Sequence, residues 1–409
     1  MRRPSDNPPA RLHGAILPTV LSVSIVMLTI LSGLVVLWER ESQAFARAQR
    51  LRQARADIES AATLYRLHPD DGRLTEADGF LLCDTLPQSR VRLRREPWGL
   101  YELLRMATSD SLATGCRLMG AEPDAARTLC YAGGRATVTL AGRTELRGEL
   151  RLPPNGLAYG RVGSDFFRGH RIPRTAQRRA GPRLPAADAA VGRRIDSLLA
   201  AGELLPPSGV PDSLAVPFRS GETLSLRIGD AALGGRTLRG RIVLHGDELR
   251  IDSTCRMEHI AIVARKITVA AGARIAVQLF ARDTVLVEPR AVLEYPSGIV
   301  SGRYAELGER SRISGYVIVR DTAERQEPAV CYRQARTARL RGLLRVEGPA
   351  QVQGIVAGCA LLRQAVFRSP QGYYKDLLYD CTIIENPVTA QPLGCGAGTG
   401  RRKEAAWVE

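Results

Sequence analysis

Between residues 249 and 299 the sequence repeats one apolar pattern every 18 residues. In each of three repeats the side chains at i, i+2, i+6, i+8, i+12 and i+14 are apolar, with Ser297 as the one exception. Apolar residues two apart lie on the same face of a short strand. Three such strands make a coil, and a coil with unpaired strand edges has to stack on another coil. The pattern therefore predicts a mainly β protein containing a parallel β-helix, a β-solenoid of about 18 residues per coil.

The pattern continues with small insertions at 305–319 and 344–358, and it also occurs upstream at 138–152. A glycine recurs at matching corners of these coils, where we expect a backbone bend that a side chain would hinder. The handedness of the β-helix stays open. The residues expected to line its core are Leu249, Ile251, Ile267, Val269, Ile275, Val285, Val287, Leu293, Ile313 and Val352. The corner glycines are Gly148, Gly240, Gly315 and Gly354.

A second feature is the uncharged run of 24 residues from Ala15 to Trp38. As a helix it would be about 36 Å long, which exceeds a hydrocarbon core of roughly 30 Å. The apolar region of a cleavable signal peptide is shorter, at roughly 7–15 residues. The run therefore predicts a single transmembrane helix.

Helical patterning continues after the span and ends near His68. One stripe with spacings of four and three consists of Ala44, Ala48, Leu51, Ala54, Ile58, Ala61 and Tyr65. Such a stripe indicates an amphipathic helix. It can pack against the protein's own soluble part or against like helices of other chains, and the sequence leaves both alternatives open.

The N-terminus resembles that of type IV pilin-like proteins, in particular the minor pseudopilins of type II secretion systems. The resemblance rests on the basic leader Arg11-Leu12-His13-Gly14, the apolar span with Pro18, and the amphipathic helix. It implies cleavage by a prepilin peptidase between Gly14 and Ala15. The sequence departs from the family at the fifth mature position, where most pilins carry Glu and this chain has Thr19.

The repeat resembles two further families. Val269-Ala270-Ala271-Gly272-Ala273 is similar to the hexapeptide motif of acyltransferases, which use a histidine at a coil corner as a catalytic base. His245 and His259 are the histidines beside coils. The short strands, corner glycines and apolar ladders also resemble bactofilins, which form cytoskeletal polymers. The whole layout resembles bacterial envelope proteins that join a pilin-like N-terminus to such a solenoid.

These features divide the chain into eight parts. They are a basic leader at 1–14, the transmembrane helix at 15–38, an amphipathic helix at 39–68, a small β-rich region at 72–135, a first coil at 136–153, an insertion with one helix at 154–222, the main β-helix at 223–387 and a flexible tail at 388–409. The helix in the insertion is expected at Ala187–Ala201, and a second insertion at Arg320–Arg339.

Charge and composition narrow the choice of partners. The net charge is +16, but 55 of the 58 basic residues are arginines spread along the chain, and aromatic residues make up only 5%. Nucleic-acid binding is therefore not expected. The eight cysteines form no C-x-x-C and no metal-ligand spacing with histidine, so no metal site is predicted. If the bulk is extracytoplasmic, Cys83, Cys116 and Cys130 are candidates for one disulfide.

No catalytic, cofactor or small-molecule site is predicted. The run from Gly394 to Gly400 is similar to a phosphate-binding loop, but it follows no predicted strand and opens no helix. We expect a single-pass inner-membrane protein with a periplasmic bulk, although arginines on both sides of the span leave its orientation open. The expected function is a structural or interaction scaffold whose partners are the membrane and other protein subunits, either copies of itself or pilin-like. The alternatives are a bactofilin-like scaffold on the cytoplasmic face and a membrane-tethered hexapeptide acyltransferase.

Overall fold

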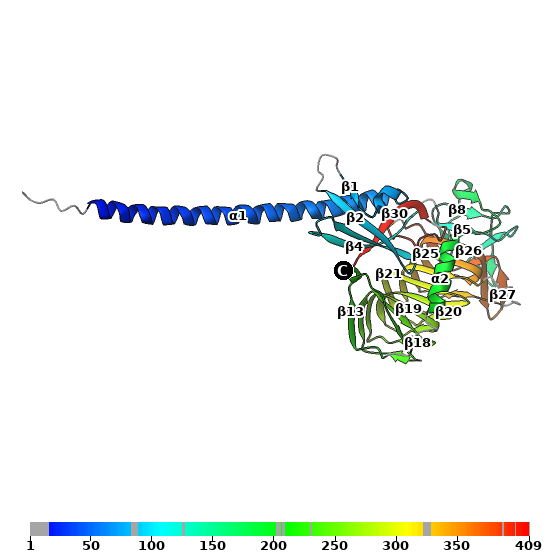
Figure 1. Ribbon diagram of the computed structural model, residues 1–409. Helices are drawn as coiled ribbons and strands as arrows, with labels where there is room; N and C mark the ends of the chain where they lie inside the picture. Colours follow the sequence, from blue (N-terminus) through cyan, green and yellow to red (C-terminus); the bar gives the residue numbers. More distant parts are fainter. Residues whose placement is uncertain are drawn as a thin grey trace, which may run out of the picture.

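The computed structural model describes residues 16–82, 89–124, 127–201, 206, 209–229, 231–321, 329–386, 388–396 and 398–408. The protein is mainly β, with one long N-terminal helix that projects from a body of strands (Figure 1). The mainly β class and the N-terminal helix are thus confirmed. The expected cleavage site at Gly14 and Ala15 lies outside the described residues, as does Cys83.

Helix α1 (Ile16–Leu67) is one continuous helix of 52 residues, about 78 Å long. It includes both the apolar span and the amphipathic stripe. Its end is set by Pro69, because the residue before a proline is disfavoured in helical conformation. The amide of His68 still donates to the carbonyl of Leu64 at 2.9 Å.

The last turns of α1 pack on a five-stranded antiparallel sheet, ordered β1–β2–β3–β4–β30. Its strands are β1 (Phe80–Leu81), β2 (Arg90–Trp98), β3 (Tyr101–Thr108), β4 (Thr114–Pro123) and β30 (Gly398–Trp407). A short 3-10 turn, η1 (Gly72–Thr75), leads from the helix toward the sheet. We call these strands the helix sheet.

Strand β30 corrects the expectation of a flexible tail at 388–409. It pairs antiparallel with β4, from Gly398 opposite Pro123 to Trp407 opposite Arg117. The segment is rich in glycine and charge and shows no alternation of apolar residues, because it forms the exposed edge of the sheet. Edge strands commonly carry such charges.

The second and larger sheet consists of parallel strands, apart from the hairpin β26–β27. Leu249 pairs with Ile267 and Ile267 pairs with Val285, an offset of 18 residues each time. We call this sheet, together with a three-stranded parallel sheet of β28, β6 and β9, the parallel stack. The strands of its first half are β13 (Ser213–Val216), β14 (Leu224–Arg227), β15 (Ala231–Leu233), β16 (Thr237–Gly240), β17 (Ile242–His245), β18 (Glu248–Ile251), β19 (Arg256–Val269), β20 (Arg274–Val287) and β21 (Val292–Ser301). The second half contains β22 (Tyr304–Leu307), β23 (Arg312–Val319), β24 (Tyr332–Gln334), β25 (Arg339–Gln351), β26 (Gly354–Ser369), β27 (Gly372–Lys375) and β29 (Cys381–Ile384).

The spatial order of the parallel stack differs from its chain order. The early strands β5 (Leu129–Tyr131), β7 (Glu145–Leu146), β8 (Leu150–Leu152) and β12 (Gln177–Arg179) continue the stack beyond β26 and β29, and do not precede β13. The same order holds for β28 (Leu377–Tyr379), β6 (Val138–Ala141) and β9 (Leu157–Tyr159). Residues 129–152 therefore cover the edge of the stack formed by strands β26, β28 and β29.

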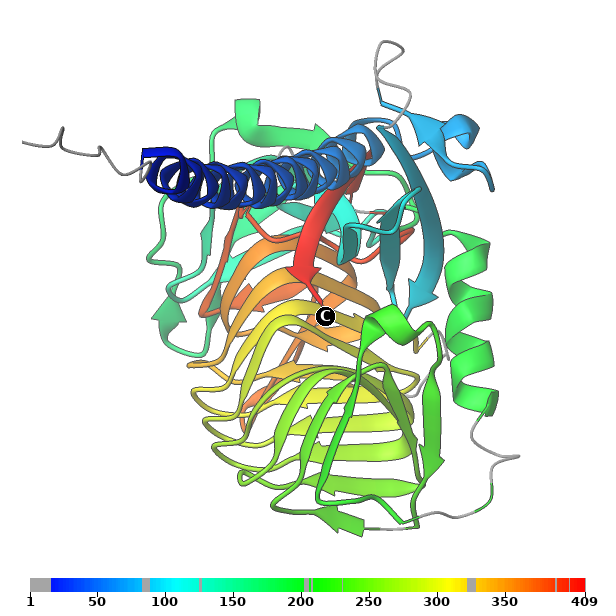
Figure 2. The ribbon, with the colours of Figure 1, turned by 60° about the vertical axis from the view of Figure 1, so that its left-hand side comes forward.

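Between β12 and β13 the chain crosses from one end of the stack to the other through helix α2 (Ala189–Ala201). This helix lies along the side of the stack (Figure 2). Val191 and Ile195 are the buried residues of this helix. Two boundaries also change. Strand β13 pairs with β16, so the stack resumes at 213 and not at 223, and β24 lies within the expected insertion at 320–339. A separate hairpin joins β10 (Arg161–Val162) to β11 (Asp165–Phe166).

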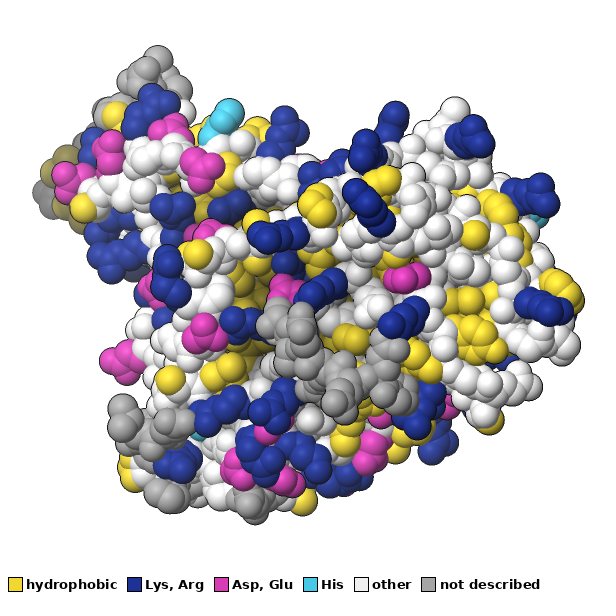
Figure 3. All heavy atoms as spheres, turned by 90° about the vertical axis from the view of Figure 1, so that its right-hand side faces the viewer, with side chains coloured by type: hydrophobic (Ala, Val, Ile, Leu, Met, Phe, Trp, Pro, Cys, Tyr) yellow, Lys and Arg dark blue, Asp and Glu magenta, His cyan; other side chains and the backbone are white. Residues whose placement is uncertain are grey.

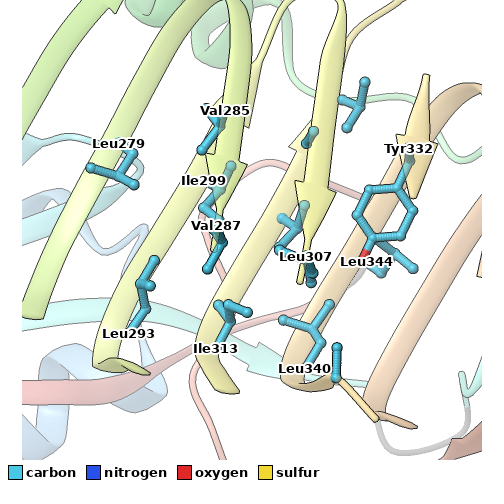
Figure 4. Packing of buried hydrophobic residues seen from close by; sticks show 14 of the residues in the cluster. Leu279, Val285, Val287, Leu293, Ile299, Leu307, Ile313, Tyr332, Leu340 and Leu344 are labelled. Carbon is cyan, nitrogen blue, oxygen red and sulfur yellow. The ribbon is translucent and has the colours of Figure 1, made fainter. Parts of the chain in front are cut away.

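The core of the stack is one cluster of aliphatic side chains that interlock from strand to strand (Figure 4). All ten residues expected to line the core belong to it, and each is at most 3% exposed. The four expected corner glycines all have positive φ, from 70° at Gly354 to 141° at Gly315.

Three glycines lie in register at one corner of neighbouring strands. Gly315 pairs with Gly342, and Gly342 pairs with Gly358. Gly342 has φ 131°, and a Cβ on it would overlap the carbonyl oxygen of Gly315. Only a residue without a side chain lets the strands approach this closely.

We expect Gly342→Ala to lower the free energy of unfolding by about 2–4 kcal/mol, since it adds backbone strain and a clash with main chain. Urea unfolding of the purified chain in detergent, followed by circular dichroism, measures the change. Gly272→Ala is the matched control, because Gly272 also has positive φ (76°) but has open space around it. Equal losses in the two variants would show that strain alone matters at this corner.

One buried glutamine joins the helix sheet to the parallel stack. Gln278 of β20 is 3% exposed, and its Oε1 accepts from the amide of Leu100 at 2.9 Å and from the hydroxyl of Tyr316 at 2.7 Å. Its Nε2 donates to the carbonyl of Trp98 at 3.1 Å. Around it, Trp98 packs edge-on against Phe218 with ring centroids 5.3 Å apart. The junction is thus a buried polar centre whose partners include groups of two aromatic residues, Trp98 and Tyr316.

Replacing this glutamine by leucine leaves a buried amide and a buried hydroxyl unpaired. We expect Gln278→Leu to cost about 2–4 kcal/mol of stability. The change is measured by urea unfolding with tryptophan fluorescence, which Trp98 reports from within the junction. Gln371→Leu is the control on an exposed turn and should shift stability by about 0.5 kcal/mol or less. A neutral Gln278→Leu would mean that the glutamine does not hold the junction together.

Candidate functional site

The exposed apolar half of α1 is the most unusual surface of the molecule. It is the one described helix long and apolar enough to cross a membrane, with a mean hydropathy of 2.6 over its best window and none of that window buried. Leu17 is 80% exposed and Trp38 72%. A contiguous apolar surface of this size is unfavourable in water and marks a contact with membrane or protein.

The C-terminal end of α1 is fixed by packing. Ala54, Ile58, Ala61 and Tyr65 recur at spacings of four, three and four, so they share one helix face. They form a buried cluster with apolar residues of the helix sheet: Val91, Leu93, Leu104, Met106 and Met119. Of the two alternatives for the amphipathic stripe, the structure therefore shows its lower part packed on the protein's own sheet.

Arg117 of β4 adds a polar connection between α1 and the C-terminal strand. Its side chain is 5% exposed and pairs with Glu59 of α1 and with Glu404 of β30, the latter at 2.8 Å. Its guanidinium also lies 4.0 Å from the centre of the Trp407 ring. Nearby, burial and the adjacent Glu102 carboxylate raise the pKa of Tyr65 to about 12, so this tyrosine stays neutral. The helix is therefore joined to its sheet by an ion pair as well as by apolar contact.

The two histidines singled out from the sequence lie at different places. His245 is 3% exposed and lines a cavity of about 250 Å³ beside Leu199 of α2. Burial lowers the pKa of His245, and its Nδ1 has no hydrogen-bond partner in the described part of the chain. His259 is half-buried with φ 59°, and its carbonyl accepts from the indole of Trp98 at 3.1 Å. The two are therefore not part of one site.

The cavity beside His245 is lined by one carboxylate and three guanidinium groups. Those side chains are Asp247, Arg227, Arg265 and Arg282. The Asp247 carboxylate accepts from Arg265 at 3.0 Å, so it does not orient the imidazole as in a base–carboxylate pair. An acyltransferase at this place stays a prediction.

The glycine-rich run at 394–400 connects the parallel stack to the helix sheet. The carbonyl of Gly394 accepts from the amide of Asp188, just before α2, at 2.7 Å, and Gly398 opens β30. The preceding Leu393 donates to the carbonyl of Leu100 at 2.9 Å. The described part of the run therefore lies against the fold as a connecting segment.

The seven described cysteines are buried and free, so Cys116 and Cys130 are not joined to each other. Burial raises the pKa of Cys359 and of Cys381 to about 12, which keeps these thiols protonated and unreactive. Among the described residues no group of three or more His, Cys, Asp or Glu could hold a metal ion. On the face in Figure 3 basic side chains outnumber acidic ones, as the net charge of +16 implies.

Comparison with known proteins identifies no family. No protein-family model matches the chain, and no curated protein matches it. Among solved structures, the crystal structure of an ice-binding protein from the Antarctic ascomycete Antarctomyces psychrotrophicus is similar over 65% of this chain and 98% of that chain. The sequence identity is 14% and the TM-score is 0.21.

Proposed function

We propose that this chain is a membrane-anchored structural scaffold of the bacterial cell envelope, with α1 inserted in the inner membrane and the β body on the periplasmic side. The observation that carries the proposal is the contrast between the two ends of α1. From Leu17 to Leu37 the helix exposes apolar side chains together with a few serine, threonine, proline and glycine residues. Its C-terminal end, from Ala54 to Tyr65, packs on the helix sheet. A helix built in this way needs an apolar surrounding at one end and holds a folded body at the other.

The scaffold is a minor pilin-like component of a secretion or pilus-like apparatus in this proposal. A long helix whose C-terminal end packs on an antiparallel sheet supports it, together with the leader that ends at Gly14. The amphipathic residues Ala44 and Ala48 lie before the packed part of the helix and remain available to like helices of neighbouring subunits. The partners of the protein are then the membrane and other pilin-like subunits.

The parallel stack is a β-solenoid in this proposal, and its long faces provide contact area. The repeated offset of 18 residues between paired strands and the single aliphatic cluster along them support this reading. Because the helix sheet and the stack share the junction at Gln278, the solenoid is held at a fixed position relative to the anchor.

A cysteine pair tests the solenoid. Thr268 lies opposite Leu286 in the next strand, and neighbouring strands are about 4.8 Å apart, within the range that a disulfide can join. We expect Thr268→Cys with Leu286→Cys to form a disulfide on mild oxidation, detected by mass spectrometry of the tryptic digest. The control pair, Thr268→Cys with Glu306→Cys, lies two strands apart at about 9.6 Å and should not form one. A disulfide in the control pair and none in the test pair would exclude the stacking of these strands in this order.

Accessibility in cells tests the orientation. The described cysteines are buried, so a single exposed one, Arg193→Cys in a Cys83→Ser background, gives little background labelling. We expect a maleimide that cannot cross the inner membrane to label this cysteine in spheroplasts. Labelling only after lysis would place the body in the cytoplasm and favour a bactofilin-like scaffold.

The same preparation tests the pilin-like part of the proposal. We expect the mass of the purified chain to lack residues 1–14 when a prepilin peptidase is present, and to retain them in a strain without the peptidase. A periplasmic body with an uncleaved leader would leave the scaffold in place but remove its assignment to a pilin-like apparatus.

A further inference from the structure

One outward face of the parallel stack carries arginines in register. Along it, Arg274 pairs with Val292, Val292 with Arg312, and Arg312 with Arg339. In the strand on the other side of Arg274, Glu258 pairs with Ala276, which puts Arg256 level with Arg274. Their neighbours Ile275, Leu293, Ile313 and Leu340 point into the core, so these arginines point outward. We call this surface the arginine face.

A second column runs beside the first. Arg239 pairs with Glu258, and further along the stack Ser314 pairs with Arg341. The acidic residues of the face are already bound, because Glu258 lies 3.3 Å from Arg239 and Glu294 lies 2.7 Å from Arg274.

Four arginines of the face have no acidic partner in the described part of the chain. They are Arg256, Arg312, Arg339 and Arg341, and all four are exposed. Two more exposed arginines, Arg290 and Arg310, lie at the adjoining corner of the stack. The face therefore presents an unbalanced positive charge along the stack axis.

The arginine content of the whole chain does not explain this surface. The face beside it has the same strand geometry, and its outward column contains Arg250, Thr268, Leu286, Glu306, Arg333 and Gln351. In that column Arg250 is paired with Glu288. Two faces built by one repeat thus differ in charge, with one balanced and the other basic.

The positive column is unfavourable for the protein alone. Arg312 and Arg339 lie directly opposite each other on neighbouring strands, and like charges in that position are destabilising. A carboxylate or sulfate between two guanidinium groups removes the repulsion and can accept two hydrogen bonds from each. Arg312 and Arg339 are one strand spacing apart, about 4.8 Å, and Arg256 lies three strand steps from Arg312. The arrangement therefore favours a long ligand with several anionic groups along its length, some of them about one strand spacing apart.

We propose that the arginine face binds a linear anionic polysaccharide that carries one carboxylate or sulfate group per sugar, because the length of one sugar is comparable to the strand spacing. From Arg256 to Arg339 the column extends over four strand steps, about 19 Å. The outward residues of the face include no aromatic side chain, so it lacks the stacking platforms that single-stranded nucleic acid uses. The binding itself is independent of the proposed pilin-like assembly, which concerns α1.

The test uses the full chain in a neutral detergent and polygalacturonate as the probe, with neutral dextran as the uncharged comparison. The variant is Arg256→Gln, Arg312→Gln, Arg339→Gln and Arg341→Gln combined. We expect it to weaken the Kd for polygalacturonate at least tenfold at 0.15 M salt, and to reduce the salt dependence of binding, while dextran binds neither protein. Circular dichroism verifies that the variant is folded, as we expect because the four arginines are exposed.

A charge-matched control separates the face from the net charge. Arg193→Gln, Arg333→Gln, Arg363→Gln and Arg401→Gln combined remove the same charge from exposed positions on α2, β24, β26 and β30. We expect this control to change the Kd less than twofold. Equal weakening by both variants, or no binding of polygalacturonate by the unchanged chain, would overturn the proposal. Tighter binding of a single-stranded oligonucleotide, lost with the same four arginines, would assign the face to nucleic acid.

Discussion

The structure depends on the close lateral approach of parallel strands whose apolar side chains interlock in register. Each strand covers the edge of the one before it, and the aliphatic cluster is continuous from Leu150 at one end to Leu233 at the other. The strands can approach this closely only where no side chain overlaps the backbone of the neighbouring strand. Gly315, Gly342 and Gly358 meet this requirement, because a Cβ at any of them would overlap a neighbouring carbonyl oxygen. Hydrophobic burial supplies the stabilisation, and glycine at the corner makes the geometry accessible.

The connection between the stack, the helix sheet and α1 uses a different kind of interaction. Gln278 satisfies main-chain groups of the turn at Trp98 and Leu100, and Arg117 joins α1 to the C-terminal strand. Buried polar groups of this kind are expensive when unpaired, so they favour one relative arrangement of the parts over others. The C-terminal strand β30 is added to the edge of the helix sheet after the chain has completed the stack.

The sequence predicts the structural features that its repeat determines and does not predict those that depend on contacts between distant residues. The burial of the ten core residues follows from the spacing of apolar residues, because most of them recur at equivalent positions of an 18-residue repeat. The bend at the four corner glycines follows instead from the recurrence of glycine at matching corners, and all four have positive φ. Spacing does not specify which coil stacks on which, so the sequence does not predict that β5 pairs with β26 and β7 with β29. Strand β30 and Gln278 were missed for the same reason. Each is determined by a partner more than 170 residues away, and neither carries a local pattern.

The arginine face depends both on the sequence repeat and on the pairing of strands that are distant in the sequence. Its columns are visible only when the strand register is known, since the residues between Arg312 and Arg339 interrupt the repeat in the sequence. Once registered, the positions show that charge on this protein is not uniform, although arginines are spread along the whole chain. A rigid stack keeps those charges at fixed spacing, so little conformational entropy is lost when an extended polyanion binds. The interlocked core that stabilises the stack is then also what makes its surface a regular template.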